Sequence, residues 1–570
     1  MEDLTAPTRP WIDHYPPGIV WQQSLDKTPV HEQVLAACEK RSKATALDFL
    51  GAETSFESLG LQIRAFAGAL QKDFGVKPGS RVAFLLPNTP FYPIAYYAVL
   101  LAGGTVVNCN PLYTVSELSH IVKNADADIL ITVDIESVFK KAEALCHGGV
   151  VDQLIVCAFP RALPPLKRFL FTLFKRSELA LISSSLVSSK ISLFHEQIAK
   201  NILPESVAID PDTHVAVQQY TGGTTGLPKG AMLSHANIST QLNQIKIWGP
   251  GVFDPPNQVI AVLPFFHVFA MTVCMNTPLS NGASVVMLPR FELKSFLDLL
   301  ARTRPSVLPA VPTLLHAIAN SNSATQEHLK SLDLAISGGA GLPDETRKLF
   351  AKKSGALLAE GYGLTETSPV LTCSALKVPS KPNSIGQPLP CTDVAFVSLE
   401  DPTKFVAPGE RGELVARGPQ VMLGYYANEE ETKNAFVNGW FRTGDVGYMD
   451  EEGYAFLVDR IKDLIICSGF NVYPRTIENA ILQHPDVDEC TVIGVKDSYR
   501  GEAPIAFVKL NAGANPTKED IKTSLTERLS KLEMPREIIF KAELPKTLIG
   551  KLSKKELREE YAQLKDKVDD

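Results

Sequence analysis

The chain has 570 residues, a length that implies several folding units rather than one domain. Hydrophobic residues make up 45% of it and charged residues 21%, which excludes a disordered or collagen-like protein. Its 56 Lys and Arg residues are outnumbered by 63 Asp and Glu residues, so the net charge is -7 and the basic excess of a nucleic-acid-binding protein is missing. We expect no nucleic-acid partner.

The cysteines and the first residues indicate a cytoplasmic location. Nine cysteines form no C-x-x-C pair, so we expect reduced thiols. The opening segment MEDLTAPTRPWIDHYPPG contains early acidic residues and no apolar core, unlike a secretory signal. Two uncharged stretches, 82–116 and 255–289, are interrupted by Pro, Asn and Gly and lack the roughly 20 apolar residues of a membrane-spanning helix.

Strand and helix patterns alternate along the first two thirds of the chain. RVAFLLPN, TVVNCN, DILITV and QLIVC predict strands, and FYPIAYYAVLLAGG and ELSHIVKNA predict helices between them. The alternation resumes after residue 214 with strands VAVQQY, QVIAVLP, SVVMLP, VLPAV, LDLAIS and ALLAE, and with helices that begin near Ser234, Glu292 and Pro343. This order predicts two α/β layers with parallel sheets.

The texture changes in the last third. Residues 385–458 contain short strands separated by Gly and Pro, which predicts a small β-rich subdomain. After Arg460, the helix TIENAILQ, the strands CTVIGV, APIAFVKL and EIIFKAEL, and a helix behind Thr517 predict a small α+β domain. The expected fold class is therefore α/β, with a large domain over residues 1–459 and a second domain over residues 460–570.

The segment YTGGTTGLPKGAM, residues 220–232, has the composition of a phosphate-binding loop. Glycines allow backbone N–H groups to approach an anion, threonine hydroxyls add hydrogen bonds, and a lysine supplies a cation. The candidate ligands are Thr221, Gly222, Gly223, Thr224, Thr225, Gly226 and Lys229. The segment lacks the Gly-Lys-Ser/Thr ending of a Walker A loop, and strand-like sequences flank it on both sides.

This loop resembles the hallmark of the adenylate-forming superfamily, which includes acyl-CoA synthetases, luciferases and peptide-synthetase adenylation domains. Five further motifs follow in the order typical of that superfamily: SGGAGL (337–342), EGYGLTETSP (360–369), WFRTGDVG (440–447), DRIKDLIICSGFNVYP (459–474) and LPKTLIGKL (544–552). The resemblance extends from about residue 30 to residue 558. It implies an AMP-binding large domain and a mobile C-terminal domain that rotates about a hinge at Lys462.

The resemblance also implies roles for individual residues. Gly339, Ala340 and Tyr362 would form the adenine slot, Thr365 would contact the α-phosphate, and Glu366 would hold Mg²⁺. Asp445 would bind the ribose hydroxyls with Arg460 nearby, and His267 would lie beside the carboxylate of the substrate.

The remaining implied roles belong to the C-terminal domain. Lys551 would place a cation between the attacking carboxylate and the α-phosphate of ATP, which repel each other by about 4 kcal/mol per charge pair at 4 Å and an effective dielectric constant of 20. Ser468 and Gly469 would line the path of the CoA pantetheine arm.

VVNCNPLYT (106–114) and the segment 438–463 resemble bacterial long-chain fatty acid-CoA ligases in particular. That resemblance implies ATP-dependent formation of an acyl-AMP from a fatty acid, followed by transfer to CoA. An amino-acid substrate is disfavoured, because LPFFHVFA and its neighbouring motifs contain no acid for an amino group. Some long-chain members place a gating Trp four residues after the histidine, where this chain has Met271.

Two alternatives remain open at the level of sequence. One is a CoA ligase for a medium-chain, short-chain or aryl carboxylic acid. The other is a non-catalytic acyl- or nucleotide-binding protein on the same fold, because a fold alone does not fix a function.

Residues 161–176, RALPPLKRFLFTLFKR, contain five basic residues and no acid. On a helix, Leu166, Phe169, Leu170, Leu173 and Phe174 form one apolar stripe, with Lys167 and Arg176 beside it and Arg168 and Lys175 opposite. This layout is typical of a helix that lies on an anionic membrane, here the inner face of the cytoplasmic membrane. The alternative is a helix whose apolar stripe packs on its own domain.

Overall fold

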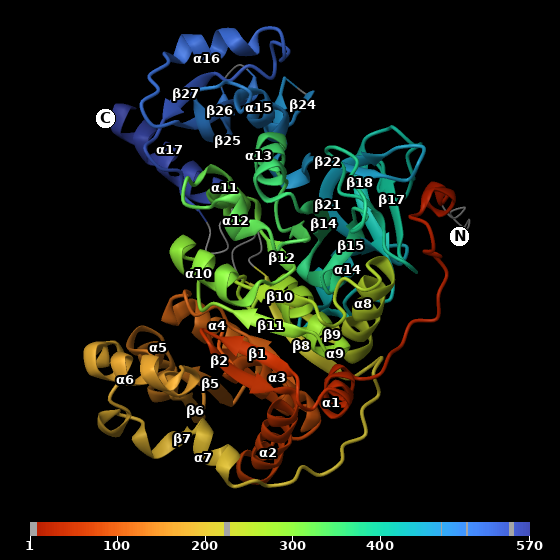
Figure 1. Ribbon diagram of the computed structural model, residues 1–570. Helices are drawn as coiled ribbons and strands as arrows, with labels where there is room; N and C mark the ends of the chain where they lie inside the picture. Colours follow the sequence, from red (N-terminus) through yellow and green to blue (C-terminus); the bar gives the residue numbers. More distant parts are fainter. Residues whose placement is uncertain (1–7, 222–227, 469, 498–499, 547–551, 570) are drawn as a thin grey trace.

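The structure is a computed structural model that describes residues 8–221, 228–468, 470–497, 500–546 and 552–569, with side chains described up to residue 563. Its described strands form four β-sheets (Figure 1). Two larger sheets form the body of the molecule, a small sheet lies beside them, and another small sheet belongs to the C-terminal domain at the top of the view. The predicted fold class is confirmed.

An eight-stranded sheet contains the two strands that flank the predicted phosphate-binding loop. Its strands, in spatial order, are β19 (Gly424–Tyr425), β9 (Lys229–Ser234), β8 (Val215–Thr221), β4 (Thr105–Asn108), β3 (Arg81–Leu85), β5 (Ile129–Val133), β6 (Gln153–Cys157) and β7 (Ile191–Leu193). The strands from β8 to β7 are parallel, whereas β9 and β19 add in antiparallel orientation. All five residues of β5 are buried, as expected for a strand covered on both faces.

Five of the described helices belong to this layer, and two of them begin at a local side-chain cap. They are α3 (Phe91–Leu101), α4 (Val115–Ala125), α5 (Glu136–His147), α7 (Phe194–Ala199) and α8 (His235–Trp248). Thr114 and Glu117 form a capping box at the start of α4, and Ser234 caps α8. The predicted start near Ser234 is confirmed.

A nine-stranded sheet forms the second layer. Its order is β16 (Gln387–Pro388), β15 (Val370–Cys373), β14 (Leu357–Gly363), β13 (Leu334–Ser337), β12 (Val307–Ala310), β10 (Gln258–Ala261), β11 (Ser284–Met287), β1 (Thr45–Phe49) and β2 (Ala52–Ser55). The strands from β14 to β1 are parallel. The helices of this layer are α1 (Val30–Lys40), α2 (Phe56–Phe74), α9 (Thr277–Asn281), α10 (Leu293–Thr303), α11 (Pro312–Asn320), α12 (Gln326–Leu329) and α13 (Asp344–Ser354).

One hydrophobic core joins the two layers. It includes Phe84 of the eight-stranded sheet, Tyr96 of α3, Val285 of the nine-stranded sheet, and Met271 and Met275 from a π-helix (Ala270–Asn276). Each of these side chains is fully buried. Because the core runs through both layers, the two sheets behave as one body.

The β-rich subdomain predicted near residues 385–458 is present. It contains β17 (Asp393–Val397), β18 (Gly412–Arg417), β20 (Phe436–Val437), β21 (Trp440–Met449) and β22 (Ala455–Arg460), with α14 (Glu429–Asn434) before β20. The N-terminal arm runs along its outer side (Figure 1). The arm is held there by Arg9, which binds Asp393 through a 2.6 Å ion pair, and by the fully buried Trp11.

The C-terminal domain has a hydrophobic core of its own. Its elements are β23 (Ile465–Cys467), β24 (Phe470–Val472), α15 (Pro474–Ile481), β25 (Val487–Asp497), β26 (Gly501–Leu510), α16 (Lys518–Leu525), β27 (Glu537–Phe540) and α17 (Lys554–Asp569). A 3-10 turn, η8 (Ile461–Asp463), connects β22 of the subdomain to β23. The domain contacts the body through His316 and Asp488, whose side chains are 3.2 Å apart.

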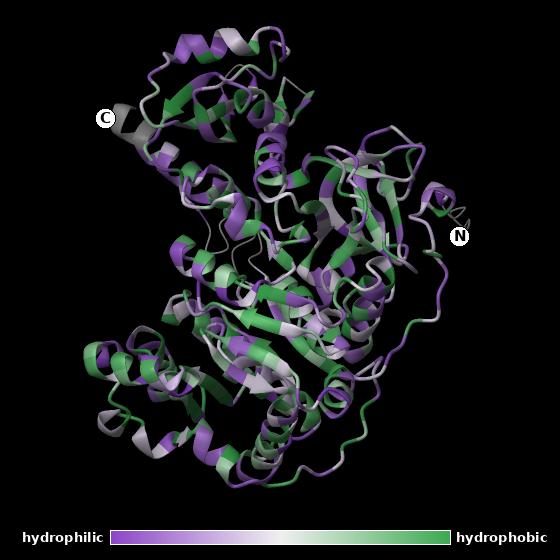
Figure 2. Ribbon diagram, viewed as in Figure 1, coloured by the Kyte–Doolittle hydropathy of each residue, from purple (hydrophilic) through white to green (hydrophobic). Residues whose placement is uncertain are grey.

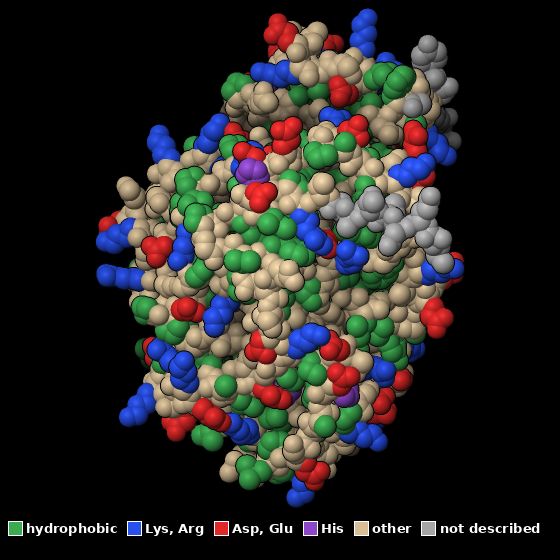
Figure 3. All heavy atoms as spheres, turned by 90° about the vertical axis from the view of Figure 1, so that its right-hand side faces the viewer, with side chains coloured by type: hydrophobic (Ala, Val, Ile, Leu, Met, Phe, Trp, Pro, Cys, Tyr) green, Lys and Arg blue, Asp and Glu red, His purple; other side chains and the backbone are tan. Residues whose placement is uncertain are grey.

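The surface carries mixed charge. Figure 3 shows Lys and Arg interspersed with Asp and Glu over the face that contains the right-hand side of Figure 1.

The nine cysteines are free thiols, and Cys391 is the one that is not fully buried. Among the described residues, no helix combines the length and the apolar character needed to cross a bilayer.

The segment 161–176 forms the helix α6 (Pro165–Phe174) at the periphery of the molecule (Figure 1). No residue of α6 is buried. The exposed fractions of its apolar stripe are 71% for Leu166, 64% for Phe169, 42% for Leu170, 59% for Leu173 and 73% for Phe174. Figure 2 shows both hydrophobic and hydrophilic residues on this helix. The apolar stripe is therefore not packed on the domain that carries it.

Candidate active site

A cavity of about 960 Å³ lies where the two sheet layers, the subdomain and the C-terminal domain meet. Thr221 of β8 and Tyr362 of β14 line it from the two layers, Thr443 lines it from the subdomain, and Lys462 and Glu556 line it from the C-terminal part. The carboxyl ends of β8, β13 and β14 all lead into this cavity, which is the usual position of a ligand site in open α/β sheets.

The β8–β9 pair carries the ends of the predicted phosphate-binding loop to the cavity. Thr221 ends β8 and Lys229 begins β9, and both line the cavity. The Lys229 ammonium group forms an ion pair with Glu431 of α14. The other predicted ligands of the loop, Gly222, Gly223, Thr224, Thr225 and Gly226, lie outside the described residues.

The predicted nucleotide slot is formed by β13 and β14. Gly339 follows β13 with a left-handed φ of +85° and lines the cavity. Tyr362 lies on β14, lines the cavity and is buried. Ala340 follows Gly339 on an exposed turn and does not line the cavity.

Asp445 and Arg460 lie directly behind Tyr362. They are opposite each other on the antiparallel strands β21 and β22, and Arg460 Nε is 2.9 Å from Asp445 Oδ1. The Tyr362 hydroxyl donates to Asp445 Oδ2 at 2.7 Å. Asp445 is buried and does not line the cavity, whereas Arg460 does. The ion pair and the tyrosine hydrogen bond therefore fix the Asp445 carboxylate, for which the family resemblance implies contact with the ribose.

Glu366 is a buried carboxylate held by a tyrosine. It lies with Thr365 in a short 3-10 turn after β14, and both residues line the cavity. The Tyr425 hydroxyl donates to Glu366 Oε1 at 2.7 Å. Burial raises the pKa of Glu366, and the hydrogen bond from Tyr425 opposes that shift.

Glu366 fits the requirements of a magnesium site. Mg²⁺ in nucleotide-dependent enzymes takes one or two carboxylates together with substrate phosphates and water. A carboxylate that accepts a hydrogen bond at one oxygen still has its second oxygen for a cation. Among the described residues, no group of three or more His, Cys, Asp and Glu side chains is arranged to hold a metal by itself. A cation here would therefore depend on the bound nucleotide.

His267 is half-buried, lines the cavity and lies just before the helical residues that lead into the π-helix. The backbone beside it is held by Gln219, whose Nε2 donates to the Phe266 carbonyl at 2.8 Å. Gln219 in turn accepts from Asn108 Nδ2 at 2.9 Å. This buried polar chain connects β4 and β8 to the histidine.

The cavity also has many apolar lining residues. They are Ile245, Trp248, Phe253, Val273, Ile336, Leu376 and Leu389. The Trp248 indole donates to the Ser374 carbonyl at 3.0 Å, so its ring is fixed. Met271, at the position of the gating residue, is fully buried in the core and does not line the cavity.

Two parts of the C-terminal domain are placed differently relative to the cavity. Lys462 and Glu556 line it, whereas Ser468, in the turn between β23 and β24, does not. Ser468 has a left-handed φ of +51°, and its N–H donates to the Arg500 carbonyl at 2.6 Å. Lys551 and Gly469 lie outside the described residues.

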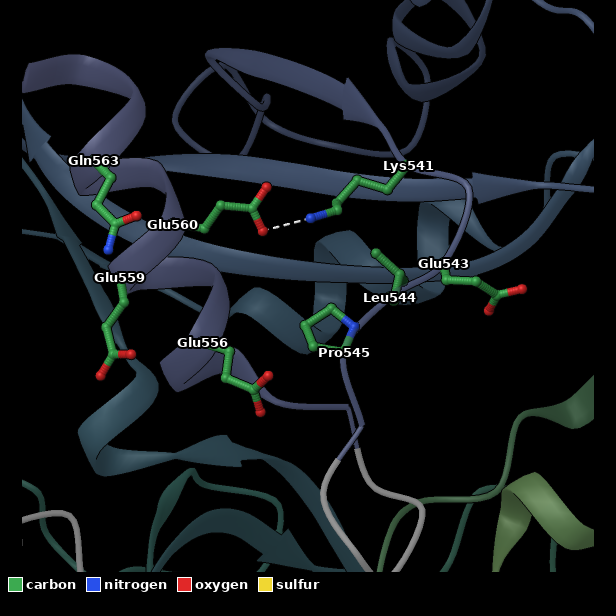
Figure 4. A pocket seen from close by; sticks show the side chains of 8 residues that line it. All are labelled: Lys541, Glu543, Leu544, Pro545, Glu556, Glu559, Glu560 and Gln563. Carbon is green, nitrogen blue, oxygen red and sulfur yellow. Dashed lines mark hydrogen bonds and ion pairs between the residues drawn. The ribbon is translucent and has the colours of Figure 1, made fainter. Parts of the chain in front are cut away.

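A second hollow lies within the C-terminal domain (Figure 4). Glu556, Glu559, Glu560 and Gln563 of α17 face Lys541, Glu543, Leu544 and Pro545, which follow β27. Lys541 forms an ion pair with Glu560. Nothing else in the described part of this hollow indicates a ligand.

Several residues of the site were not predicted from the sequence. Tyr425 and Glu431 come from a segment without a recognised motif, although three successive acids at the start of a short helix were visible. Asn108 and Gln219 hold the backbone near His267. The pair Gln218–Gln219 within an otherwise apolar strand was a usable signal, because buried amides need partners.

The family comparison agrees with this geometry. The model of the AMP-binding enzyme family matches residues 34–426, and the model of the AMP-binding enzyme C-terminal domain matches residues 476–551. The chain therefore belongs to the AMP-binding enzyme family, and its predicted resemblance to the adenylate-forming superfamily is confirmed.

Individual relatives narrow the class. A long-chain-fatty-acid–CoA ligase of Bacillus subtilis is 37% identical over 552 residues, which cover 97% of this chain and 98% of that protein. A long-chain-fatty-acid–CoA ligase of Escherichia coli O157:H7 is 34% identical over 560 residues, which cover 96% of this chain and 98% of that protein. The structure of ATP-bound MatB from Rhodopseudomonas palustris superimposes with a TM-score of 0.81 at 28% identity, over 94% of this chain and 99% of that one.

Proposed function

We propose that this chain is an AMP-forming long-chain fatty acid-CoA ligase. The observation that carries the proposal is the composition of one cavity, which joins phosphate-binding and carboxylate side chains to an apolar lining. Lys229, Thr365 and Glu366 line this cavity together with Trp248, Phe253 and Leu376. An ATP and an acyl chain would therefore share the same space, with their reacting groups near His267.

The proposed reaction has two steps. A fatty carboxylate oxygen attacks the α-phosphorus of ATP and displaces pyrophosphate, which gives acyl-AMP. The CoA thiol then attacks the acyl carbonyl carbon and displaces AMP. In the first step, Lys229 binds the outer phosphates, Thr365 the α-phosphate, and Lys551 the two approaching anions. Glu366 would hold Mg²⁺, which neutralises phosphate charge when it is bound.

A long apolar chain suits the cavity. Each methylene group removed from water contributes about 0.8 kcal/mol, so a chain of many carbons supplies most of its own binding energy. A cavity of about 960 Å³ lies at the upper end of the range for small-molecule sites, which suits two ligands together. An aryl or short-chain acid would leave much of the apolar lining without contact.

The thiol step requires a second arrangement of the C-terminal domain. Ser468 lies away from the cavity, whereas Glu556 of α17 lines it. We propose that domains 1–459 and 460–570 turn about Lys462 so that the β23–β24 turn replaces the α17 end at the cavity. Lys462 lies in the short turn between the two sheets, where a few residues can absorb a change in backbone angles.

Pyrophosphate release tests the proposed activity. Purified full-length protein is incubated with ATP, MgCl₂ and acids from C4 to C18 and with benzoate, with and without CoA. We expect release of pyrophosphate with C12 to C18 acids, and AMP and acyl-CoA when CoA is present. ADP as the product, or activity confined to aryl or short-chain acids, would contradict the proposal.

The two half-reactions test Lys551. Lys551→Ala should abolish pyrophosphate release but retain thioester formation from supplied acyl-adenylate and CoA. Lys546→Ala, in the same segment, is the matched control, because Lys546 forms an ion pair with Glu489 at the surface. Equal loss of both half-reactions in Lys551→Ala would remove the proposed role.

We also propose that α6 binds the anionic inner face of the cytoplasmic membrane, from which fatty acids enter. Support comes from its five exposed apolar side chains and from the basic residues beside them. Lys167 donates to the Leu50 carbonyl and Arg168 to the Pro160 carbonyl, and neither forms an ion pair with a described carboxylate. Lys175 pairs with Glu178. Exposed apolar surface of this kind marks an interaction site.

Vesicle flotation tests this contact. Reversing Lys167, Arg168, Lys175 and Arg176 to Glu should release the protein from vesicles with anionic lipid by at least tenfold, since each basic residue near such a surface contributes about 1 kcal/mol. Reversal of the exposed Lys352, Lys518, Arg528 and Lys531 is the control. Unchanged flotation of the α6 variant would refute the contact, and activity on a soluble acid should persist.

A further inference from the structure

The phosphate lysine has an ion-pair partner that no part of the proposed reaction uses. Lys229 lines the cavity, and its ammonium group pairs with Glu431 of α14. The side chains are 19% and 35% exposed, so the pair is largely shielded from water. Glu431 itself does not line the cavity. The lysine is thus drawn toward a carboxylate that lies behind the cavity wall.

The backbone fixes this pair in place. Strand β19 pairs with β9, the strand that begins with Lys229, and Tyr426 N–H donates to the Gly230 carbonyl at 2.8 Å. Helix α14 then starts at once, and Asn428 caps it by accepting from the Glu431 N–H at 3.1 Å. Because the backbone hydrogen bonds already hold both elements, the ion pair forms with little additional ordering.

Tyr425 connects this pair to the carboxylate proposed for magnesium. Its hydroxyl donates to Glu366, and its ring centroid is 5.4 Å from Lys229 Nζ. Two carboxylates and one ammonium group therefore surround a single tyrosine. A phosphate group that enters the cavity brings negative charge to the same ammonium group and competes with Glu431 for it.

We propose that Glu431 is the resident counter-ion of Lys229 and that the outer phosphates of ATP, or free pyrophosphate, bind by displacing it. The inference rests on the proposed function, because that function supplies the phosphates. Its consequence is that Glu431 weakens the binding of both ATP and pyrophosphate. Departing pyrophosphate therefore leaves while Glu431 takes the lysine back, which shortens the residence of the product.

Calorimetric titration of the full-length protein with magnesium pyrophosphate tests the inference. Glu431→Gln should bind pyrophosphate about two- to fivefold more tightly than the natural chain, which is the range for a partly exposed ion pair. The affinity for AMP, which lacks the outer phosphates, should not change. Pyrophosphate should also become a stronger inhibitor of the overall reaction by the same factor.

Glu430→Gln is the matched control, because Glu430 is exposed on the same helix and changes the net charge equally. Lys229→Met provides the second background, in which Glu431→Gln should have no further effect. Unchanged or weaker pyrophosphate binding in Glu431→Gln, an equal gain in Glu430→Gln, or a gain that persists with Lys229→Met would overturn the proposal. The calorimetric titration contains no fatty acid and no CoA. Its result therefore does not depend on whether the protein forms acyl-CoA.

Discussion

At the residue scale, Tyr425 is the side chain that orients Glu366. A carboxylate at the end of a flexible side chain binds a cation well only when other groups hold it in place. Tyr425 supplies the 2.7 Å hydrogen bond to Glu366 Oε1 and lies on β19, which is paired to β9, the strand that begins with Lys229. Its role is therefore positioning rather than chemistry.

Tyr425→Phe should raise the Mg²⁺ concentration required for half-maximal activity by about tenfold, which is the lower range for loss of a group that orients a metal ligand. The KM for the fatty acid should not change, because the apolar lining is not altered. Magnesium titrations at saturating ATP provide the measurement. Tyr426→Phe is the control, since the Tyr426 ring contacts Arg81 instead. An equal effect in both variants would contradict the assignment.

Val273 is a second informative residue, because it lies on the apolar lining and is only 3% exposed. Val273→Phe should shift the preferred substrate toward shorter acids by filling part of the cavity, and Val273→Ala should act in the opposite direction. The ratio of kcat/KM for C16 and C10 acids provides the measurement, and the C10 value serves as an internal control for folding. A ratio unaffected by both substitutions would exclude Val273 from the acyl site.

The motifs in the sequence pointed to residues that the structure brings to one cavity. The family resemblance implied nucleotide-binding roles for Gly339, Tyr362, Thr365 and Glu366, and all four line the cavity. Tyr425 and Glu431 were missed because they act on side chains 59 and 202 positions away. Such contacts arise from strand pairing, which no local pattern of residues reveals.

At the element scale, helix starts were predicted well from local residues. Ser234 and Thr517 cap the helices that were predicted to begin beside them, because capping depends on residues within one turn. The two-residue strand β19 was not predicted, since two residues display no period. The sequence of α6 was compatible with a helix on a membrane and with a helix packed on its own domain. Amphipathicity alone does not determine whether the apolar face is covered.

The N-terminal arm is an element whose anchoring can be tested with glycine. Gly453 has a φ of +78°, and a Cβ placed there would lie 2.4 Å from the backbone N of Trp11. Gly439 has the same φ with no atom within 4 Å. Both substitutions to Ala carry the left-handed penalty of about 1 kcal/mol, but only Gly453→Ala also displaces the arm.

We therefore expect Gly453→Ala to reduce the free energy of unfolding by about 1 to 3 kcal/mol more than Gly439→Ala does. The midpoint of thermal unfolding should accordingly be lower for Gly453→Ala. Limited proteolysis should in addition cleave the arm near residues 8–29 faster in Gly453→Ala alone. Equal behaviour of the two variants would show that the arm does not depend on this contact.

At the scale of the whole molecule, two buried histidines join the layers. His31 of α1 and His235 of α8 have ring centroids 5.6 Å apart, and both Nδ1 atoms are buried with no partner. Burial lowers the pKa of His31 to about 4 and that of His235 to about 3, from an ordinary value of 6.5. Both side chains are therefore neutral in the folded protein.

The unfolded chain binds protons at these histidines below pH 6.5, whereas the folded protein does not until about pH 4, so stability should fall as the pH decreases through this window. The loss is on the order of 2 kcal/mol per histidine at pH 5. Thermal unfolding at pH 7.5 and pH 5 should show a smaller difference for His31→Phe than for the natural chain. His147→Gln, at an exposed position, should leave the difference unchanged.

The pairing of β19 with β9 has a consequence for any attempt to express the large domain as a fragment. A protein that ends before Leu423 would lose β19 and leave the hydrogen-bonding groups of β9 open along one side. An edge strand with unpaired N–H and C=O groups can pair with strands of other chains, so such fragments should aggregate or exchange strands. A fragment that extends to Arg460 keeps β19 and also the strands β21 and β22 that complete the subdomain sheet beside β18, and it should stay monodisperse by light scattering.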